Sequence, residues 1–172
     1  MRRRALIFVS AIGAAMLSSS AQAEVTDLEV KAAFLPRFAR YVTWPAAAWR
    51  GDQPVSLCVI GDDPFGNLLN QSIAGQQVDG RNFVVKRLSS AAGASDCAIA
   101  FVDGSRTDEI LQSLAHQPVL TVTDSRFGSE RGIIHFVIVG GRVRFSINNR
   151  QAREDGLTIS SRLLALAVGV SG

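Results

Sequence analysis

The two cysteines are the first residues of this sequence whose side chains can do chemistry. Cys58 stands within the apolar run Val55–Ile60, and Cys97 directly precedes a second apolar run at 98–102. If the two runs form neighbouring parallel strands, one disulfide joins them and closes a loop of about 40 residues. The alternative is a pair of buried free thiols, and an even cysteine count favours the disulfide in an oxidising compartment.

Carboxylates offer a second kind of chemistry. Acidic and hydroxyl side chains follow three of the apolar runs, so a parallel sheet would gather them at its carboxyl edge, where open α/β folds bind ligands. These residues are Asp62, Asp63, Asp103, Asp124 and Ser125. Paired carboxylates there can bind a cation or act as general acid and base. Asp and Ser after a strand also serve as helix caps and turn residues, and both interpretations are open.

The usual signatures of catalysis are missing from the sequence. His116 and His135 are the only histidines, and neither stands at metal-site spacing from cysteines or carboxylates. The chain has no Gly-x-Ser-x-Gly, P-loop or Gly-x-Gly-x-x-Gly motif. We therefore predict no enzymatic activity, no metal and no cofactor. An envelope hydrolase that uses Asp62, Asp63 and Asp124 is the least favoured alternative.

Aromatic and basic side chains provide candidate contact surfaces. Trp44 and Trp49 lie near the end of the first predicted helix, where they either contact a ligand or partner or complete the core. Arg142 and Arg144 alternate with apolar residues, so they share one face of a strand, and Arg150 follows the hairpin to which that strand belongs. This face is either a contact surface for an acidic partner or a solvated surface.

The N-terminus has the organisation of a secretory signal peptide. Met1–Arg4 is positively charged, Ala5–Leu17 is apolar, and Ala21–Ala23 has the small-x-small pattern of a cleavage site. We expect cleavage after Ala23, so that 1–23 is the leader and 24–172 is a mature periplasmic domain. A retained membrane anchor is the alternative, although the apolar stretch is short for a span.

Cleavage would also change the charge balance of the protein. The full chain carries 18 Lys and Arg against 15 Asp and Glu, and three of the arginines lie in the leader. The mature chain therefore has 15 basic and 15 acidic residues, which is a net charge near zero. This balance gives no indication of binding to nucleic acid or to anionic lipid.

The first element expected to position these residues is a helix over Val25–Val42. Apolar residues including Val30 and Phe34 recur every four positions, whereas Lys31 falls largely off that stripe. Pro36 lacks a backbone donor and should kink or divide the helix. The phenylalanines of the stripe are expected either to pack in the core or to form an aromatic face for a partner.

The rest of the chain alternates between short apolar runs and helical patterns. Strands are expected at 55–60, 82–88, 98–102, 119–123, 133–139 and 142–147. Helices are expected at 65–73, 104–115 and 161–170, and a polar turn is expected at Gly75–Gly80. Gly140-Gly141 is a two-residue hairpin signal. The prediction is a single α/β domain with a mostly parallel sheet of about six strands, an antiparallel hairpin at one edge, and helices on both faces.

Several stretches together resemble the YfiR family of periplasmic regulators. They are Val30–Leu35 with Trp44-Pro45, Leu57–Gly66, Leu120–Asp124, Ile134–Arg144 and Leu157–Leu164. The resemblance runs in order over essentially the whole predicted mature chain. The set as a whole is more specific than any of its members.

The resemblance implies more than the residues alone do. Proteins of this kind are periplasmic repressors that bind the periplasmic sensor part of an inner-membrane diguanylate cyclase, and release of the cyclase raises cyclic di-GMP and favours biofilm formation. An outer-membrane lipoprotein can sequester the repressor, redox state can act through its disulfides, and members are often homodimers. Cys58 and Cys97 match one disulfide position of the family, and a second bridge found in some members has no cysteines here.

Two functional hypotheses therefore lead. The first is a non-enzymatic regulator that binds the membrane cyclase. The second is a periplasmic module that binds a small ligand at the carboxyl edge of the sheet, with Trp44 or Trp49 stacking on it.

Overall fold

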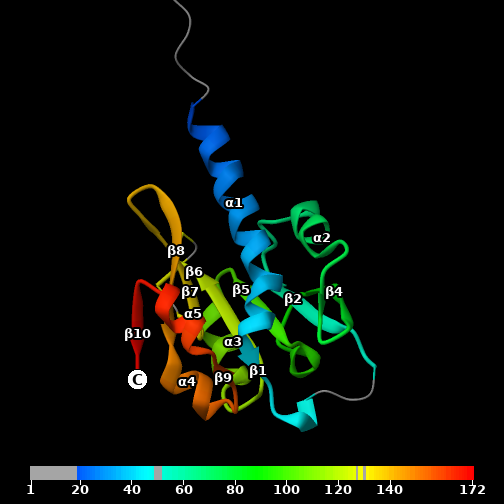
Figure 1. Cartoon of the computed structure of the whole chain (residues 1–172). Helices are drawn as coiled ribbons and strands as arrows, with labels where there is room; N and C mark the ends of the chain where they lie inside the picture. Colours follow the sequence, from blue (N-terminus) through cyan, green and yellow to red (C-terminus); the bar gives the residue numbers. More distant parts are fainter. Residues whose placement is uncertain (1–18, 49–51, 127, 130) are drawn as a thin grey trace, which may run out of the picture.

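The computed structural model describes residues 19–48, 52–126, 128–129 and 131–172 (Figure 1). Most of the predicted leader and Trp49 lie outside the described residues, and cleavage after Ala23 stays a prediction. Across the described part of the chain, we find no helix with both the length and the apolar character needed to cross a bilayer.

An eight-stranded sheet forms the centre of the molecule, with the order β10-β8-β7-β6-β5-β2-β4-β3. Its strands are β2 (Val55–Gly61), β3 (Gln77–Val78), β4 (Arg81–Leu88), β5 (Ile99–Asp103), β6 (Leu120–Asp124), β7 (Ile134–Val139), β8 (Arg142–Asn148) and β10 (Gly169–Ser171). The five strands from β4 to β7 pair in parallel, as the alternation of strands and helices predicts. The predicted α/β class with a mostly parallel sheet is therefore confirmed.

Short strands, helices and 3-10 turns complete the chain. The α-helices are α1 (Ser19–Phe38), α2 (Asn67–Ile73), α3 (Thr107–Leu114), α4 (Asn149–Glu154) and α5 (Ser161–Leu166). The 3-10 turns are η1 (Ala39–Tyr41), η2 (Ala46–Ala48) and η3 (Ala94–Asp96). A separate two-stranded antiparallel sheet joins β1 (Val42–Thr43) to β9 (Thr158–Ile159), which fastens the end of the α1 segment to the C-terminal region.

Helices cover both faces of the sheet, as predicted. On one face, α1 and α2 bury Leu35, Phe38 and Leu69 against the sheet in the larger core cluster. Phe38 of α1 lies between Phe136 and Phe145, with ring centroids 5.8 and 5.3 Å away. Phe38 is therefore a core residue and Phe34 packs against the core while partly buried, which is a common outcome of helical spacing on one face.

The second face holds a smaller core that contains both cysteines. Cys58 and Ile60 of β2 pack there with Ile110 and Leu114 of α3. Cys58 and Cys97 form the predicted disulfide, with a Cα–Cα distance of 5.9 Å. Since β2 and β5 are parallel neighbours and Cys97 precedes β5, the strand positions on which the prediction rests are also confirmed.

The first helix differs from its prediction in four respects. It begins at Ser19 instead of Val25, it ends at Phe38 instead of Val42, and it passes through Pro36 without being divided (Figure 1). Val30, which the pattern assigns to the buried stripe, is 37% exposed, and Lys31 has no exposed surface. The sequence pattern predicts the burial of these two residues wrongly. A lysine is buried only when a partner elsewhere in the fold compensates its charge, and the spacing of apolar residues carries no information about such a partner.

The C-terminal region also corrects the prediction. The expected helix over 161–170 stops at Leu166, and Gly169–Ser171 forms β10, which pairs in parallel with β8. Val170, at the end of the expected helix, is 47% exposed. The hairpin of β7 and β8 consequently lies one strand inside the sheet edge, and the expected turn at Gly75–Gly80 contains β3.

The hairpin itself forms where the glycine pair predicts it. Gly140 and Gly141 have φ angles of 58° and 69°, the left-handed conformation that a tight two-residue connection requires. The antiparallel register pairs Val139 with Arg142 and Val137 with Arg144.

Removal of the disulfide tests its contribution to the fold. We expect the double variant Cys58→Ala/Cys97→Ala to lose about 4 kcal/mol of unfolding free energy, because the bond closes a long loop in the unfolded chain. Urea denaturation followed by circular dichroism measures the loss. A midpoint equal to that of the wild type would show that the bond does not stabilise the fold.

Candidate functional site

The carboxyl edge of the sheet brings together the acidic residues that follow β2 and β5. Gly61 and Asp103 are register partners, and the Asp62 N–H donates to the Asp103 carbonyl at 3.4 Å. Gly61 has a φ of +91°, and a Cβ atom at this position would lie 1.9 Å from the Asp103 carbonyl oxygen. The close approach of the two strand ends therefore requires glycine.

Asp63 is engaged in local structure. One of its carboxylate oxygens accepts hydrogen bonds from the backbone N–H groups of Phe65 and Gly66, at 2.8 and 3.1 Å. Its other oxygen pairs with the Arg87 guanidinium at 2.7 Å. Asp63 thus holds the turn after β2 and ties it to β4, which agrees with the turn-forming interpretation of its position in sequence.

Asp103 is buried at the same edge, and it accepts a hydrogen bond from the Gly104 N–H at 2.6 Å. Burial raises the pKa of its carboxyl group, and the nearby carboxylates of Asp62 and Asp124 raise it further, whereas the bond from Gly104 lowers it. A carboxyl group in such surroundings holds a proton more readily than an exposed one.

The carboxylate of Asp124 is fully buried and forms an ion pair with Lys31 of α1, with 2.6 Å between Nζ and Oδ2. The backbone N–H of Arg126 donates to its other oxygen at 3.1 Å. Both charged side chains of the pair are inaccessible to water, so Lys31 depends on Asp124 for compensation. The Asp124 carboxylate has a second, longer ion pair with the Arg126 guanidinium, with 3.8 Å between Nε and Oδ2. Sequence reasoning identified Asp124 but missed Lys31, since only the tertiary fold places that lysine over the end of β6.

The arrangement of these acids determines the chemistry available at the edge. A hollow of about 420 Å³ is lined by Asp62, Asp63, Pro64, Asp103, Gly104 and Ser105. Among the residues that the structure describes, no group of three or more His, Cys, Asp or Glu side chains is arranged to hold a metal. Asp63 and Asp124 already have cationic partners, and Ser125 is exposed and lies outside the lining of the hollow. The edge therefore offers Asp62 and Asp103 for contact with a ligand.

His135 of β7 belongs to a buried hydrogen-bond network beside this edge. Its Nδ1 lies 2.8 Å from the Thr123 hydroxyl, which also accepts a bond from the Gly132 N–H at 2.9 Å. Burial lowers the pKa of the His135 imidazole, the charge of Arg131 lowers it further, and Asp124 acts in the opposite direction. The network joins β6 to β7 and favours a neutral histidine.

Arg142 and Arg144 lie on the face of the hairpin turned away from α1. Phe145 of the same strand packs against α1, and alternation places the two arginines on the opposite side. Both are exposed, and within the described residues neither has an ion-pair or hydrogen-bond partner. Val139, the register partner of Arg142, is 51% exposed. Arg150 is exposed in α4, beyond the end of the strand.

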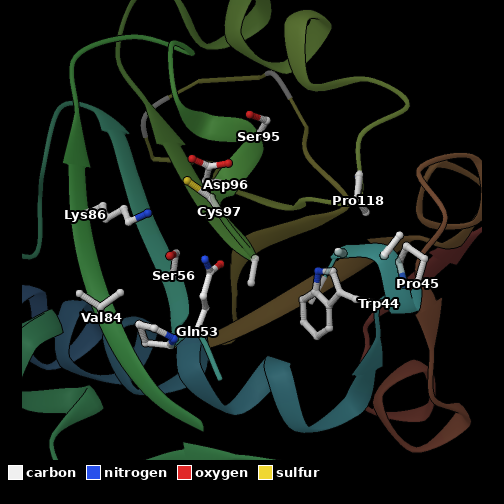
Figure 2. A pocket seen from close by; sticks show the side chains of 14 residues that line it. Trp44, Pro45, Gln53, Ser56, Val84, Lys86, Ser95, Asp96, Cys97 and Pro118 are labelled. Carbon is white, nitrogen blue, oxygen red and sulfur yellow. The ribbon is translucent and has the colours of Figure 1, made fainter. Parts of the chain in front are cut away.

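Trp44 is 6% exposed and belongs to the larger core cluster, while its edge lines a separate pocket (Figure 2). Trp49 lies outside the described residues. The structure thus places the predicted contact residues in three regions, namely the carboxyl edge, the outer face of the hairpin, and the segment after α1. Trp44 is not among the residues that line the hollow at the carboxyl edge, so the structure does not bring it to the place where the second hypothesis expects it to stack on a ligand.

Comparison with known proteins identifies a family for the chain. A family model described as YfiR/HmsC-like matches residues 28–168. The match covers α1 from Leu28 onward and the chain through α5, including both cysteines. No curated protein matches the chain.

The buried ion pair predicts a measurable energetic coupling. Lys31→Met should lower the unfolding free energy by about 3 kcal/mol, because the buried Asp124 carboxylate loses its short ion pair and keeps only the longer one with Arg126. The double variant Lys31→Met/Asp124→Leu should be markedly more stable than Lys31→Met alone. Urea denaturation of Lys31→Met, Asp124→Leu and the double variant measures the coupling, and additive losses would contradict it.

The His135 network predicts a dependence of stability on pH. Since the folded protein lowers the pKa of His135 below its ordinary value of 6.5, the unfolded chain binds more protons in the window beneath 6.5. The unfolding free energy should therefore fall as pH drops from about 7 toward 5, and His135→Gln should reduce this slope.

Thermal unfolding at matched pH values measures the effect. Burial raises the pKa values of Asp103 and of Asp155, a buried residue at the end of α4. These two carboxyl groups act in the opposite direction, so the comparison is made between variants at each pH. A slope in His135→Gln equal to that of the wild type would assign the effect to something other than His135.

Proposed function

The chain belongs to the YfiR/HmsC-like family, and from this membership we propose that it is a periplasmic, non-enzymatic regulator. In this proposal it binds the periplasmic sensor part of an inner-membrane diguanylate cyclase, and thereby represses cyclic di-GMP signalling and biofilm formation. The family match over 28–168 is the observation that carries the proposal. The disulfide between Cys58 and Cys97 is compatible with an oxidising compartment.

We propose the outer face of the hairpin as the contact surface for the cyclase. Arg142 and Arg144 point from adjacent positions of one strand face, and Val139 adds an exposed apolar side chain beside Arg142. Arginine is a common interface residue because its guanidinium forms paired hydrogen bonds with carboxylates and packs on apolar surface. A partner that presents carboxylates around an apolar centre would complement this face.

The hairpin also has the rigidity that a recognition surface needs. β7 and β8 pair along their whole length, and Phe136 and Phe145 anchor the inner side to α1. The outer side chains are therefore presented on a fixed backbone, which reduces the entropy lost on binding. The homodimer and the sequestering outer-membrane lipoprotein implied by the resemblance are further proposed partners.

A small-ligand module is the second candidate function, and the hollow at the carboxyl edge favours it. The hollow is lined by Asp62, Asp103 and Ser105, so it offers hydrogen-bond acceptors and negative charge. A ligand there would be a cationic or hydroxyl-bearing small molecule. This function predicts stoichiometric binding of a small molecule without capture of a membrane protein.

Cross-linking in the envelope tests the regulator proposal. A photoreactive amino acid at position 139 of the tagged mature protein should cross-link to a membrane protein that has a cytoplasmic cyclase domain, identified by mass spectrometry. Arg142→Glu/Arg144→Glu should reduce the yield at least about tenfold, because charge reversal places like charges across the interface.

The double variant Arg37→Glu/Arg153→Glu is the matched control, since it reverses two exposed arginines on α1 and α4 that, within the described residues, also have no side-chain partner. It should cross-link like the wild type. Equal loss in the two double variants would remove the hairpin face from the proposal. Absence of any cyclase among the products, with folded and abundant protein, would favour the ligand-binding module.

A further inference from the structure

A second pocket in the described part of the chain lies at the end of the sheet opposite to the acidic edge. Its volume is about 810 Å³, within the range of small-molecule sites. Its lining includes residues at or just before the amino ends of three parallel strands, namely Ser56 in β2, Ala98 before β5 and Pro118 before β6. Neither functional candidate above uses this pocket.

The floor of the pocket is a strip of the sheet. Ser56 pairs in register with Val84, and Cys58 pairs with Lys86, so the four side chains share the face that carries the smaller core. α3 packs against β5 on this face. The strip formed by Ser56, Val84 and Lys86 is left as a surface of the pocket.

The walls of the pocket are held in place by the fold. One wall is the turn at 95–98, which the disulfide ties to β2 through Cys97 and which the Ala98 N–H joins to the Ser56 carbonyl at 2.9 Å. The other wall includes Trp44 and Pro45, and Trp44 is itself anchored in the larger core. The pocket is therefore formed before any ligand enters, which lowers the cost of binding.

Polar groups in the pocket converge near the floor. Figure 2 shows the Lys86 and Gln53 side chains reaching into the space beside Ser56. Lys86 is half-buried and has no ion-pair partner within the described residues, and the Ser56 hydroxyl likewise has no hydrogen-bond partner there. A half-buried ammonium group gains from an anion that replaces its lost hydration. Asp96 stands on the wall formed by the turn at 95–98 and is exposed, so water screens its repulsion of such an anion.

We propose that this pocket binds a small organic anion with an apolar body. The anionic group pairs with the Lys86 ammonium group and accepts hydrogen bonds from Ser56 and Gln53. The apolar body packs against Trp44, Pro45 and the other apolar lining. This inference does not depend on the proposed regulator function, since it concerns a different end of the sheet from the acidic hollow and a different surface from the hairpin face.

Binding of 2-naphthoate, with neutral 2-naphthylmethanol as its uncharged counterpart, tests the proposal by calorimetry and NMR titration. Naphthoate should bind the full-length mature protein and shift the indole N–H signal of Trp44. Lys86→Gln should weaken naphthoate binding about tenfold, which corresponds to the loss of one partly buried charge-assisted hydrogen bond. Lys86→Arg should retain most of the affinity, and naphthylmethanol should bind wild type and Lys86→Gln with similar affinity.

Arg142→Gln is the matched control, because it removes one positive charge from a different surface. It should leave naphthoate binding unchanged, and circular dichroism establishes that each variant is folded. Three outcomes overturn the proposal. They are no naphthoate binding up to about 5 mM, an equal loss of affinity in Arg142→Gln, and an equal loss of affinity for the neutral probe in Lys86→Gln.

Discussion

The ion pair between Lys31 and Asp124 is the constraint on which the arrangement of the first helix depends. Two opposite charges are removed from water where α1 crosses the end of β6, and their Nζ–Oδ2 distance is 2.6 Å. Removal of Asp124 leaves Lys31 uncompensated, and removal of Lys31 leaves Asp124 only its longer ion pair with Arg126 at 3.8 Å. The helix and the strand end must therefore come together in one relative position. The aromatic contacts of Phe38 with Phe136 and Phe145 then supply the apolar packing along the same helix. Charge thus fixes where the helix lies, and apolar burial supplies most of the stabilisation.

The two faces of the sheet have different roles as a consequence. The face under α1 and α2 holds the larger core, and its polar groups are few and partnered. The other face has a smaller core around the disulfide and α3, with less covered strips of the sheet on either side. Lys86 lies on the strip toward β4, and Arg142 and Arg144 lie on the strip toward β8. These three basic side chains, which have no partner in the described residues, therefore stand on the face that the helices cover less completely.

Residue patterns predicted much of this fold because several segments carry local signals that agree with the tertiary structure. The run Val55–Ile60 is apolar at nearly every position, and a strand buried on both faces needs that pattern. Gly140-Gly141 specifies its hairpin through backbone conformation alone. The disulfide followed from the positions of two cysteines relative to two such strands. The family was also identified from the sequence. The resemblance rested on several stretches in a fixed order and not on any single motif.

The errors arose where a partner distant in sequence decides the outcome. Lys31 looked like a surface residue because its spacing from the apolar stripe is a local property, whereas the carboxylate that permits its burial is 93 residues away. Gly169–Ser171 looked helical because the preceding turns of α5 are helical, and the pairing with β8 that makes it a strand is a long-range contact. Lys86 gave no signal, because a lysine in a strand is ordinarily solvated and only the disulfide-held wall beside it makes a pocket. Binding sites in this fold thus depend on charges whose surroundings are created by contacts between distant segments. The local sequence pattern predicts the strands and helices that carry such residues. Whether each charged side chain is paired or exposed depends on contacts that form only in the folded protein.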